Sequence, residues 1–368
     1  MNISKSSISI AITTALISLS SVAQSNSVDD IERITVTSSF NNQPLAQAPT
    51  SVAIIGEQQI NDQAIQHFEE LINSVANLNF SGGTSRPKYL QIRGVGERSE
   101  YRGAPNSSVG FIVDDINLSG LGMAASMYDV QQVEVLRGPQ GARYGANALA
   151  GLIYIKSNDP TQTPEHGFKA TAGNDDLFNL AGYSAGAITD KLSYRVSVEQ
   201  HQNGYRDNVY LNKDDTNAID EFSGKFKLRY IASDDLNIDF TYLFADNDNG
   251  FDAWTLDNNG FDTTTDDPGV DKQKSHGAAL KFSYNGLSFA SFDAITSYTT
   301  TEHQHGYDGD WANDDYWASK SCIDDDVAAP CEYNYLWNKT AKRDVWSQEF
   351  RLTSNESSRI FDNTTAWL

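Results

Sequence analysis

The chain has 368 residues, 39% of them hydrophobic, and its 49 acidic and 27 basic side chains give a formal net charge of -22. This apolar content is enough to bury a core and excludes wholesale disorder, and the length leaves room for two or more domains. The excess of negative charge argues against nucleic acid as a partner, because the phosphate backbone carries the same sign.

The chain opens on a predicted secretory signal peptide, residues 1–23. A lysine near the start is followed by an uncharged apolar stretch (residues 8–19) and by a small-x-small cleavage pattern that ends at Ala23. The stretch is shorter than the ~20 apolar residues that a membrane-spanning helix needs. Export leads into an oxidising periplasm, so Cys322 and Cys331, the two cysteines of the chain, are expected to form a disulfide rather than a metal site.

The mature chain begins with a polar segment, residues 24–49, in which two prolines mark a linker and one run, residues 31–37 (IERITVT), has strand character. The next region, residues 50–160, has the mixed pattern of a compact α/β domain. Strand-like runs lie at residues 50–55, 109–113 and 130–136, and apolar residues at helical spacing lie between 65 and 75.

From residue 161 onward the pattern changes to long segments in which apolar and polar residues alternate. The clearest run from 191 to 201, from 221 to 231 and from 235 to 245. In the first of them Leu192 and Tyr194 fall on the face opposite Ser193, which is the period of a β-strand. Each segment has about eleven residues, a length that suits a strand crossing a membrane at a tilt better than the ~5–6 residues of a soluble strand.

The predicted connections alternate between short and long. Tight turns are expected at 189–190, 232–234 and 285–286, and long loops at 202–220, 246–274 and 301–342. Outer-membrane barrels have short periplasmic turns and long extracellular loops, so this alternation independently indicates a transmembrane barrel. About nine candidate strands can be counted, the last one near residues 367–368, and lipid offers no hydrogen bonds to an open sheet edge. The chain is therefore expected to be a fragment, a truncated reading frame or a piece that needs a second chain.

Three motifs lie within the mixed α/β region. They are residues 91–96 (QIRGVG), residues 110–115 (GFIVDD) and residues 133–153 (VEVLRGPQGARYGANALAGLI). Together they make the chain resemble the TonB-dependent outer-membrane receptors, in which such motifs belong to a plug domain. The plug-motif residues that this resemblance singles out are Arg93, Gly94, Glu134, Arg137, Gly138, Pro139, Gly141 and Gly145. Two departures, Asp114-Asp115 in place of the common Asp-Gly and Gln131-Gln132 before the third motif, concern local turn geometry and leave the Arg-Gly-Pro core intact.

The resemblance implies an α/β plug domain (residues 50–160) followed by the N-terminal part of an antiparallel transmembrane β-barrel (residues 161–368), with about nine strands of an expected 22 or so. It also implies a periplasmic N-terminus that carries a box for TonB, the energy transducer of the inner membrane. The box residues are Glu32, Ile34, Thr35, Val36 and Thr37. An extended segment of this kind can add a strand to a partner's sheet edge. By pattern alone, an ordinary first strand of the plug is the alternative.

A charge pair between plug and barrel wall is a further expectation, because the resemblance implies that Arg93 and Arg137 face wall carboxylates. Glu349 falls on the inward face of a predicted strand, next to the lipid-facing Phe350, and is the candidate partner in such a latch. An intact buried pair adds little net stability, whereas removing one partner is costly. Strand parity alone fits a solvated lumen charge equally well.

No cofactor and no metal site are expected. The glycines of residues 138–151 lack the Lys-Ser/Thr of a phosphate-binding loop. Residues 246–250 (DNDNG) miss the spacing and the acidic closer of a calcium loop and are expected in a solvated extracellular loop. His303 and His305 are expected on a mobile loop, where two histidines are weak evidence for a metal. No catalytic arrangement can be read from the spacing and the resembled family is not enzymatic, so the chain is expected not to be an enzyme.

By resemblance, the expected function is TonB-dependent import of a scarce nutrient across the outer membrane, with a ferric siderophore as the leading cargo. A glycan, cobalamin or another nutrient is an alternative, as is a truncated surface or adhesion protein that transports nothing. The implied partners are TonB, outer-membrane lipid and an extracellular small molecule. The predicted loops are rich in Asp and poor in Lys and Arg, which disfavours a strongly anionic ligand. Loop aromatics such as Trp311 and Tyr316 would suit a sugar or an aromatic ligand equally.

Overall fold

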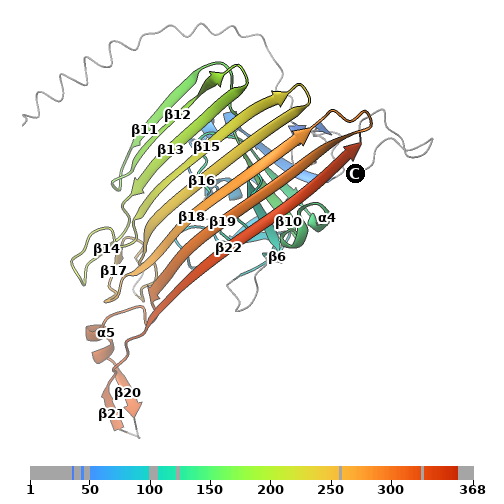
Figure 1. The fold of residues 1–368 in the computed structure, drawn as a ribbon. Coiled ribbons are helices and arrows are strands. Elements are labelled where there is room, and N and C mark those ends of the chain that lie inside the picture. Colours follow the sequence, from blue (N-terminus) through green and yellow to red (C-terminus); the bar gives the residue numbers. More distant parts are fainter. Residues whose placement is uncertain are drawn as a thin grey trace, which may run out of the picture. The chain divides into compact units, whose positions relative to one another are not determined.

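The chain folds into an α/β domain, which we call the plug domain, and a large antiparallel sheet, which we call the wall (Figure 1). The computed structural model describes residues 35–36, 43–44, 50–98, 107–121, 125–256, 259–324 and 327–354. The predicted signal peptide, the predicted last strand and three residues of the predicted TonB box, Glu32, Ile34 and Thr37, lie outside these described residues. None of the helices in the described residues is long and apolar enough to cross a membrane.

The plug domain is built on a five-stranded mixed sheet with the order β3-β9-β10-β7-β8. Its strands are β3 (Ser51–Gly56), β7 (Val109–Val113), β8 (Ile116–Asn117), β9 (Val130–Arg137) and β10 (Gly151–Ser157). The central strand β10 runs parallel to β7 and antiparallel to β9. A second, three-stranded sheet contains β4 (Leu78–Ser81), β5 (Tyr89–Ile92) and β6 (Val95–Gly96), and two short helical segments, α4 (Gly141–Tyr144) and η3 (Gly145–Asn147), precede β10.

Two short helices, α2 (Glu57–Asp62) and α3 (Glu69–Ile72), complete the plug domain. The helix predicted between residues 65 and 75 is longer than the helix in the structure, because α3 spans only four residues. Hydrogen bonds between residues three apart, such as Leu71 N to Phe68 O at 3.0 Å, take the place of the α-helical ladder around it. These turns still direct the apolar side chains inward, and all five that define the pattern are buried: Ile65, Phe68, Leu71, Ile72 and Val75.

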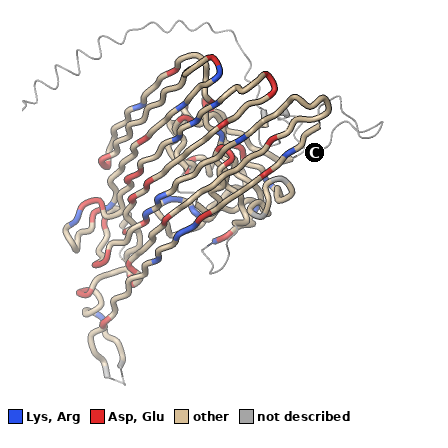
Figure 2. The backbone as a smooth tube through the Cα atoms, in the orientation of Figure 1, with Lys and Arg blue, Asp and Glu red and all other residues tan. Residues whose placement is uncertain are grey.

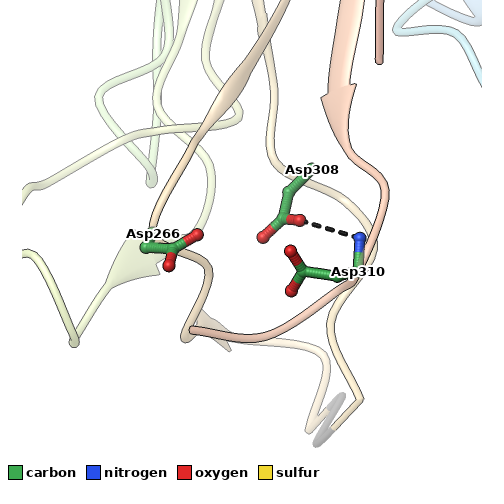
Figure 3. A group of neighbouring side chains, drawn as sticks. All are labelled: Asp266, Asp308 and Asp310. Atoms are coloured by element: carbon green, nitrogen blue, oxygen red, sulfur yellow. Dashed lines mark hydrogen bonds between the residues drawn. The ribbon is translucent and has the colours of Figure 1, made fainter. Parts of the chain in front are cut away.

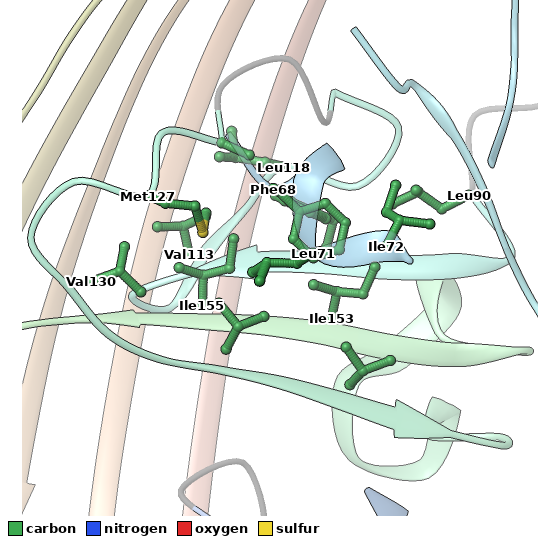
Figure 4. Close-up of a cluster of buried hydrophobic side chains, with 14 of the residues drawn as sticks. Phe68, Leu71, Ile72, Leu90, Val113, Leu118, Met127, Val130, Ile153 and Ile155 are labelled. Atoms are coloured by element: carbon green, nitrogen blue, oxygen red, sulfur yellow. The ribbon is translucent and has the colours of Figure 1, made fainter. Parts of the chain in front are cut away.

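The hydrophobic core of the plug domain lies between these helices and the mixed sheet (Figure 4). Phe68 and Phe111 meet edge to face, with 5.5 Å between their ring centroids, and they are 2% and 1% exposed. Leu118, Met127 and Ile155 belong to the same buried cluster. A core packed in this way holds the polar side chains on the surface of the domain in fixed positions.

The wall has eight antiparallel strands in sequence order, so each strand pairs with its neighbours along the chain. They are β11 (Glu165–Ala172), β12 (Phe178–Thr189), β13 (Leu192–Asn203), β15 (Ile219–Ser233), β16 (Leu236–Phe251), β18 (Gly269–Tyr284), β19 (Ala290–Asp308) and β22 (Leu336–Ser354). Residues 190–191, 234–235 and 285–289 form short connections, and residues 204–218, 252–268 and 309–335 form long ones. The long connections share one end of the wall, as the sequence predicts for a barrel, and we call this the long-loop end.

Five of the wall strands are longer than predicted, because β15 has 15 residues, β16 and β18 have 16 each, and β19 and β22 have 19 each. The segment 246–250, expected in a loop, therefore lies in β16, and His303 and His305 lie in β19 rather than on a mobile loop. The charged residues that end the apolar alternation still pair across the sheet, as in the 2.9 Å contact of Lys274 with Asp246. An exposed strand face accepts such charges, so the end of apolar alternation does not mark the end of a strand.

The two faces of the wall differ in chemistry. Apolar residues of the alternating pattern are exposed, with Val198 at 41%, Phe222 at 43% and Phe350 at 68%. Their polar neighbours face the plug domain, and Ser193 and Arg195 are only 2% and 5% exposed. A soluble sheet would show the reverse, so an outward apolar face with a polar inward face indicates the wall of a membrane barrel. Charged residues of both signs lie along the strands as well as in the connections (Figure 2).

Smaller elements occupy the long connections. They are β14 (Asp207–Asn208), β17 (Asp262–Thr263), α5 (Asp314–Ala318), β20 (Ser321–Asp324) and β21 (Val327–Pro330). β14 and β17 pair with each other and tie two of the long connections together. β20 and β21 form a hairpin beside which Cys322 and Cys331 are joined in a disulfide, with an S–S distance of 2.06 Å. The pairing expected from the sequence is therefore present in the structure.

Candidate functional site

Arg86, in the connection between β4 and β5, joins the plug domain to the wall. Its Nε and Nη2 donate to the two carboxylate oxygens of Glu221 on β15, at 2.8 and 2.9 Å, and its Nη1 contacts Glu69. Asn249 of β16 donates to the same Glu221 carboxylate at 2.9 Å. Burial by itself would lower the pKa of Arg86, which is 6% exposed, but the two carboxylates raise it, so the guanidinium stays charged. The two-pronged geometry fixes the orientation of the arginine as well as its position.

Asp271 on β18 is the centre of a second contact between plug and wall, and it is fully buried. Ser85 of the plug domain donates to Asp271 Oδ2 from its backbone N and its Oγ, at 2.7 and 2.8 Å. His303 Nε2 lies 3.2 Å from Oδ1 of the same carboxylate, and the Lys88 ammonium of the plug domain lies 3.2 Å from that ring nitrogen. His303 is thus part of the network that joins the two layers.

Further ion pairs bind the plug domain to β13 and β15. The Arg195 guanidinium of β13 donates to the Asp129 carboxylate over distances of 2.5 to 3.0 Å. Lys227 of β15 lies 3.5 Å from Asp114 and 3.0 Å from Asp159. Burial would raise the pKa of Asp159, but the cations around it lower the pKa well below its ordinary value. Asp159 is therefore ionised at neutral pH and available to pair with Lys227.

This interface can both hold and release the plug domain. Buried ion pairs fix geometry without adding much net stability, because desolvation offsets most of the attraction. Water can take over each of these hydrogen bonds when the partners separate, which it cannot do for a dry apolar contact. Leu243 and Ala279 of the wall also belong to the buried hydrophobic cluster of the plug domain, so moving the plug domain would break these apolar contacts as well as the polar ones.

The predicted latch between Glu349 and a plug arginine is not found among the described residues. Glu349 accepts hydrogen bonds from Arg351 at 2.5 and 2.8 Å instead. The Arg93 side chain is exposed, and Arg137 lies 3.4 Å from the backbone oxygen of Ala76. Arg351 lies two residues from Glu349 on the same inward face of β22, so its guanidinium is close enough to pair with that carboxylate.

The sequence analysis did not predict the residues that join plug and wall. The alternating pattern does indicate the wall side of these contacts, but no pattern indicates the plug side. The inward polar positions of the alternating strands include Arg195 and Lys227, so a list of charged inward residues would have found the wall side. Arg86 and Asp129 on the plug side lie in connections without periodicity. No local pattern distinguishes them from solvated loop charges.

The plug-motif residues lie in the turn between β5 and β6, on β9 and in the segment that follows β9. Gly94, Gly138 and Gly145 have φ values of +78°, +116° and +75°, in the region that glycine favours. Glu134 on β9 is fully buried. Pro139 follows β9, and Gly141 begins α4. These residues shape the plug domain and make no ion pair with the wall in the described part of the chain.

The Asp114-Asp115 departure from the common Asp-Gly pair is accommodated by the backbone. Asp114 and Asp115 have φ values of +47° and +67°, a left-handed conformation that aspartate tolerates better than most residues with a side chain. Asp114 also accepts a hydrogen bond from the backbone N of Ser157 at 3.0 Å. The second aspartate thus takes the turn conformation that glycine takes more cheaply.

The two described residues of the predicted TonB box form β1 (Thr35–Val36). This strand pairs antiparallel with β2 (Gln43–Pro44), Thr35 opposite Pro44 and Val36 opposite Gln43. Val36 is fully buried. The extended backbone that a partner sheet would need is therefore already formed, but it is occupied by a short pairing with the chain itself.

Aromatic rings gather at the long-loop end, on the inward side of the wall and in the connection after β16. The ring centroids of Trp254 and Tyr307 are 4.7 Å apart, and those of Tyr307 and Trp337 are 5.1 Å apart. His305 lies 5.5 Å from Trp337. Trp254 also packs on Gly83 of the plug domain, where an added Cβ would come within 2.3 Å of the indole. We call Trp254, His305, Tyr307 and Trp337 the aromatic cluster.

A plug domain with a mixed sheet, held by ion pairs against the polar face of an antiparallel wall whose outer face is apolar, defines a plugged membrane-barrel architecture. Residues 44–152 match the family model for the TonB-dependent Receptor Plug Domain. Through this domain the chain is similar to the TonB-dependent receptors.

Known proteins agree with this assignment. The chain is 26% identical over 216 residues to the pesticin receptor of Yersinia pestis, an alignment that covers 58% of this chain and 32% of that protein. It is 22% identical over 246 residues to the vitamin B12 transporter BtuB of Vibrio vulnificus, covering 64% of this chain and 38% of that protein. The crystal structure of the ferric yersiniabactin uptake receptor FyuA from Yersinia pestis superposes with a TM-score of 0.70 at 19% identity, over 84% of this chain and 46% of that one. The chain thus spans about a third of the length of these curated relatives.

Proposed function

We propose that this protein works in the outer membrane as a receptor that binds a scarce nutrient from outside and imports it when TonB pulls on the N-terminal segment. The observation that carries the proposal is the plug domain bound to the inward face of the wall through Arg86, Asp129 and Lys227. Such a plug closes a pore and yet can be displaced. The proposed function requires positioning and movement of the plug domain and no catalytic residue.

The outward face of the wall supports a membrane location. Trp346 and Phe350 on β22 are 69% and 68% exposed, as lipid-facing residues would be. Toward the long-loop end of the same face, Asp246, Lys274 and Glu302 carry charges on neighbouring strands, and Lys342 pairs with Glu302 at 3.3 Å. An apolar band that ends at a row of charges fits a membrane boundary, with the longer strands rising beyond it.

Ferric siderophores are the cargo class that we favour. One of the similar structures is a ferric yersiniabactin uptake receptor, and a curated relative is a ferric enterobactin receptor of Pseudomonas aeruginosa. The aromatic cluster offers flat faces of the kind that bind aromatic ligand groups. Cobalamin is the second candidate, because of the similarity to a vitamin B12 transporter.

A proline at Val36 tests the proposed link to TonB. Val36→Pro removes the backbone N–H that strand addition needs, so we expect loss of binding to the periplasmic domain of TonB and loss of growth on iron-limited medium that depends on this protein. Binding is measured with the native protein in detergent and purified TonB domain. Growth under cobalamin limitation, measured in parallel, separates the two cargo candidates.

Gln47→Pro, in the linker between Pro44 and Pro49, is the matched control and should leave TonB binding and growth intact. If Val36→Pro and Gln47→Pro behaved alike, the segment at Thr35–Val36 would not be the TonB contact. If the native protein bound TonB but Val36→Pro changed growth under neither limitation, the result would instead count against transport of these nutrients.

A further inference from the structure

Three carboxylates meet at the long-loop end of the wall, where the connection 252–268 approaches the connection 309–335 (Figure 3). Asp266 belongs to the first connection, Asp308 ends β19, and Asp310 follows it in the second connection. One oxygen from each carboxylate lies within 4.8 Å of the other two. Asp308 and Asp310 are only 4% and 2% exposed. We call these three residues the carboxylate cluster.

The negative charge of the carboxylate cluster is only partly compensated. The Asp310 carboxylate accepts hydrogen bonds from Trp317 Nε1 at 2.9 Å and from the backbone N of Tyr335 at 2.8 Å. The Asp308 Oδ1 atom accepts from the backbone N of Asp310 at 3.0 Å. These donors are neutral dipoles, and no Lys or Arg in the described part of the chain forms an ion pair with the cluster.

Two oxygens of the carboxylate cluster are buried without any hydrogen-bond partner, Oδ2 of Asp308 and Oδ1 of Asp266. The Asp308 and Asp310 carboxylates point toward each other, with Asp266 facing them across the gap between the connections (Figure 3). A buried carboxylate oxygen that lacks a partner is costly, and three carboxylates at this distance also repel one another. A bound cation would remove both penalties at once.

We propose that Asp266, Asp308 and Asp310 form a calcium site that joins the two connections. The ligand atoms are all carboxylate oxygens, which suit a hard cation and offer no thiolate or imidazole for a transition metal. At Ca–O distances of about 2.3–2.6 Å, oxygens on opposite sides of one ion are up to about 5 Å apart, so three oxygens within 4.8 Å of one another can share one ion. Magnesium, at about 2.0–2.1 Å, demands strict octahedral order, which suits ligands from two separate connections less well.

The proposed ion would fix the loops that stand next to the aromatic cluster. Backbone hydrogen bonds already link the two connections, Leu256 N to Trp311 O at 2.9 Å and Asp266 N to Ala312 O at 3.0 Å. Calcium would add a charge-compensated joint between Asp266 on one side and Asp308 and Asp310 on the other. Removal of calcium would therefore loosen both connections without disturbing the plug domain.

Terbium luminescence tests the site directly in the full-length protein, purified in detergent and freed of metal with EDTA. Trp317 donates its indole N–H to Asp310, so Tb³⁺ bound in the cluster would be sensitised by that ring. We expect saturable Tb³⁺ emission that Ca²⁺ displaces more effectively than Mg²⁺, and a rise in the midpoint of thermal unfolding on addition of Ca²⁺ alone. Asp308→Asn should weaken Ca²⁺ binding by roughly tenfold or more, because the charge of the ligand set controls affinity.

Asp267→Asn is the matched control, because Asp267 is the exposed neighbour of Asp266 and should leave binding unchanged. Asp266→Asn is the second variant if Asp308→Asn does not fold, and Trp317→Phe should lose emission while keeping Ca²⁺ binding in calorimetry. Equal affinity of Asp308→Asn or Asp266→Asn and the native protein overturns the proposal, and so does the absence of Ca²⁺ binding by the native protein. These readouts need neither TonB nor a nutrient, so their failure is separate from failure of the proposed transport.

Discussion

Replacing Glu221 by glutamine is expected to destabilise the contact between plug and wall by about 3 kcal/mol. Loss of one partner from a buried ion pair costs about 3–5 kcal/mol, because the other charge stays buried without compensation. The side chains of Arg86 and Glu221 are 7% and 12% exposed, so solvent screens the pair little. Glu69 retains its contact with Arg86, which places the expected cost at the lower end of the range. Hydrogen exchange of the amides in β4 and β5, in the full-length protein, measures this loss.

The exposed pair of Glu302 with Lys342 provides the control for that result. Their side chains are 66% and 61% exposed, so Glu302→Gln should change stability by no more than about 1 kcal/mol. The double variant Arg86→Gln with Glu221→Gln should recover part of the loss, because the only uncompensated charge it leaves among these three residues is that of Glu69, whose side chain is 29% exposed. Equal effects of Glu221→Gln and Glu302→Gln would mean that the buried pair does not hold the plug domain.

Truncation of Phe111 to alanine is expected to be the most damaging change in the plug core. The side chain is 1% exposed and packs edge to face on Phe68, so its removal should cost about 3–5 kcal/mol through lost burial and the cavity left behind. Urea unfolding of the full-length protein, followed by hydrogen exchange in β7 and β10, measures the change.

Phe80→Ala is the control for the core prediction, since Phe80 on β4 is 50% exposed. It should change stability by about 0.5 kcal/mol or less, as surface substitutions do. Because β7 leads into the turn that carries Asp114, loss of the Phe111 packing should also weaken the contact with Lys227. Unchanged exchange in β7 after Phe111→Ala would show that the cluster does not act as one core.

The sequence patterns predict which face of the wall each residue occupies better than they predict where a strand ends. Leu192 and Ser193 alternate because lipid and plug domain select opposite chemistry on the two faces, and this selection is local. The end of a strand depends on pairing with neighbouring strands. The segment 246–250 reads as a polar loop, but the pairing of Asp246 with Lys274 on β18 extends β16 through it.

The candidate sites depend on residues that are far apart in the sequence. Arg86 and Glu221 are separated by 135 positions, and neither lies in a motif. The carboxylate cluster has the same character, because Asp266 meets Asp308 and Asp310 only through the folding of two connections onto each other. The expectation that no metal is bound rested on linear ligand spacing, which cannot detect such a cluster.

Trp254 contacts the plug domain at Gly83 and the wall at Tyr307, so its fluorescence is expected to report a change in their relative position. The indole rests on a point of the plug domain where any side chain larger than hydrogen would collide with it, and it touches Tyr307 on the wall at the same time. A ligand that inserts among the rings and a pull that withdraws the plug domain would therefore change the surroundings of the same tryptophan. Under the proposed function, ligand binding on one side of the membrane and the pull of TonB on the other would both change the emission of this one residue.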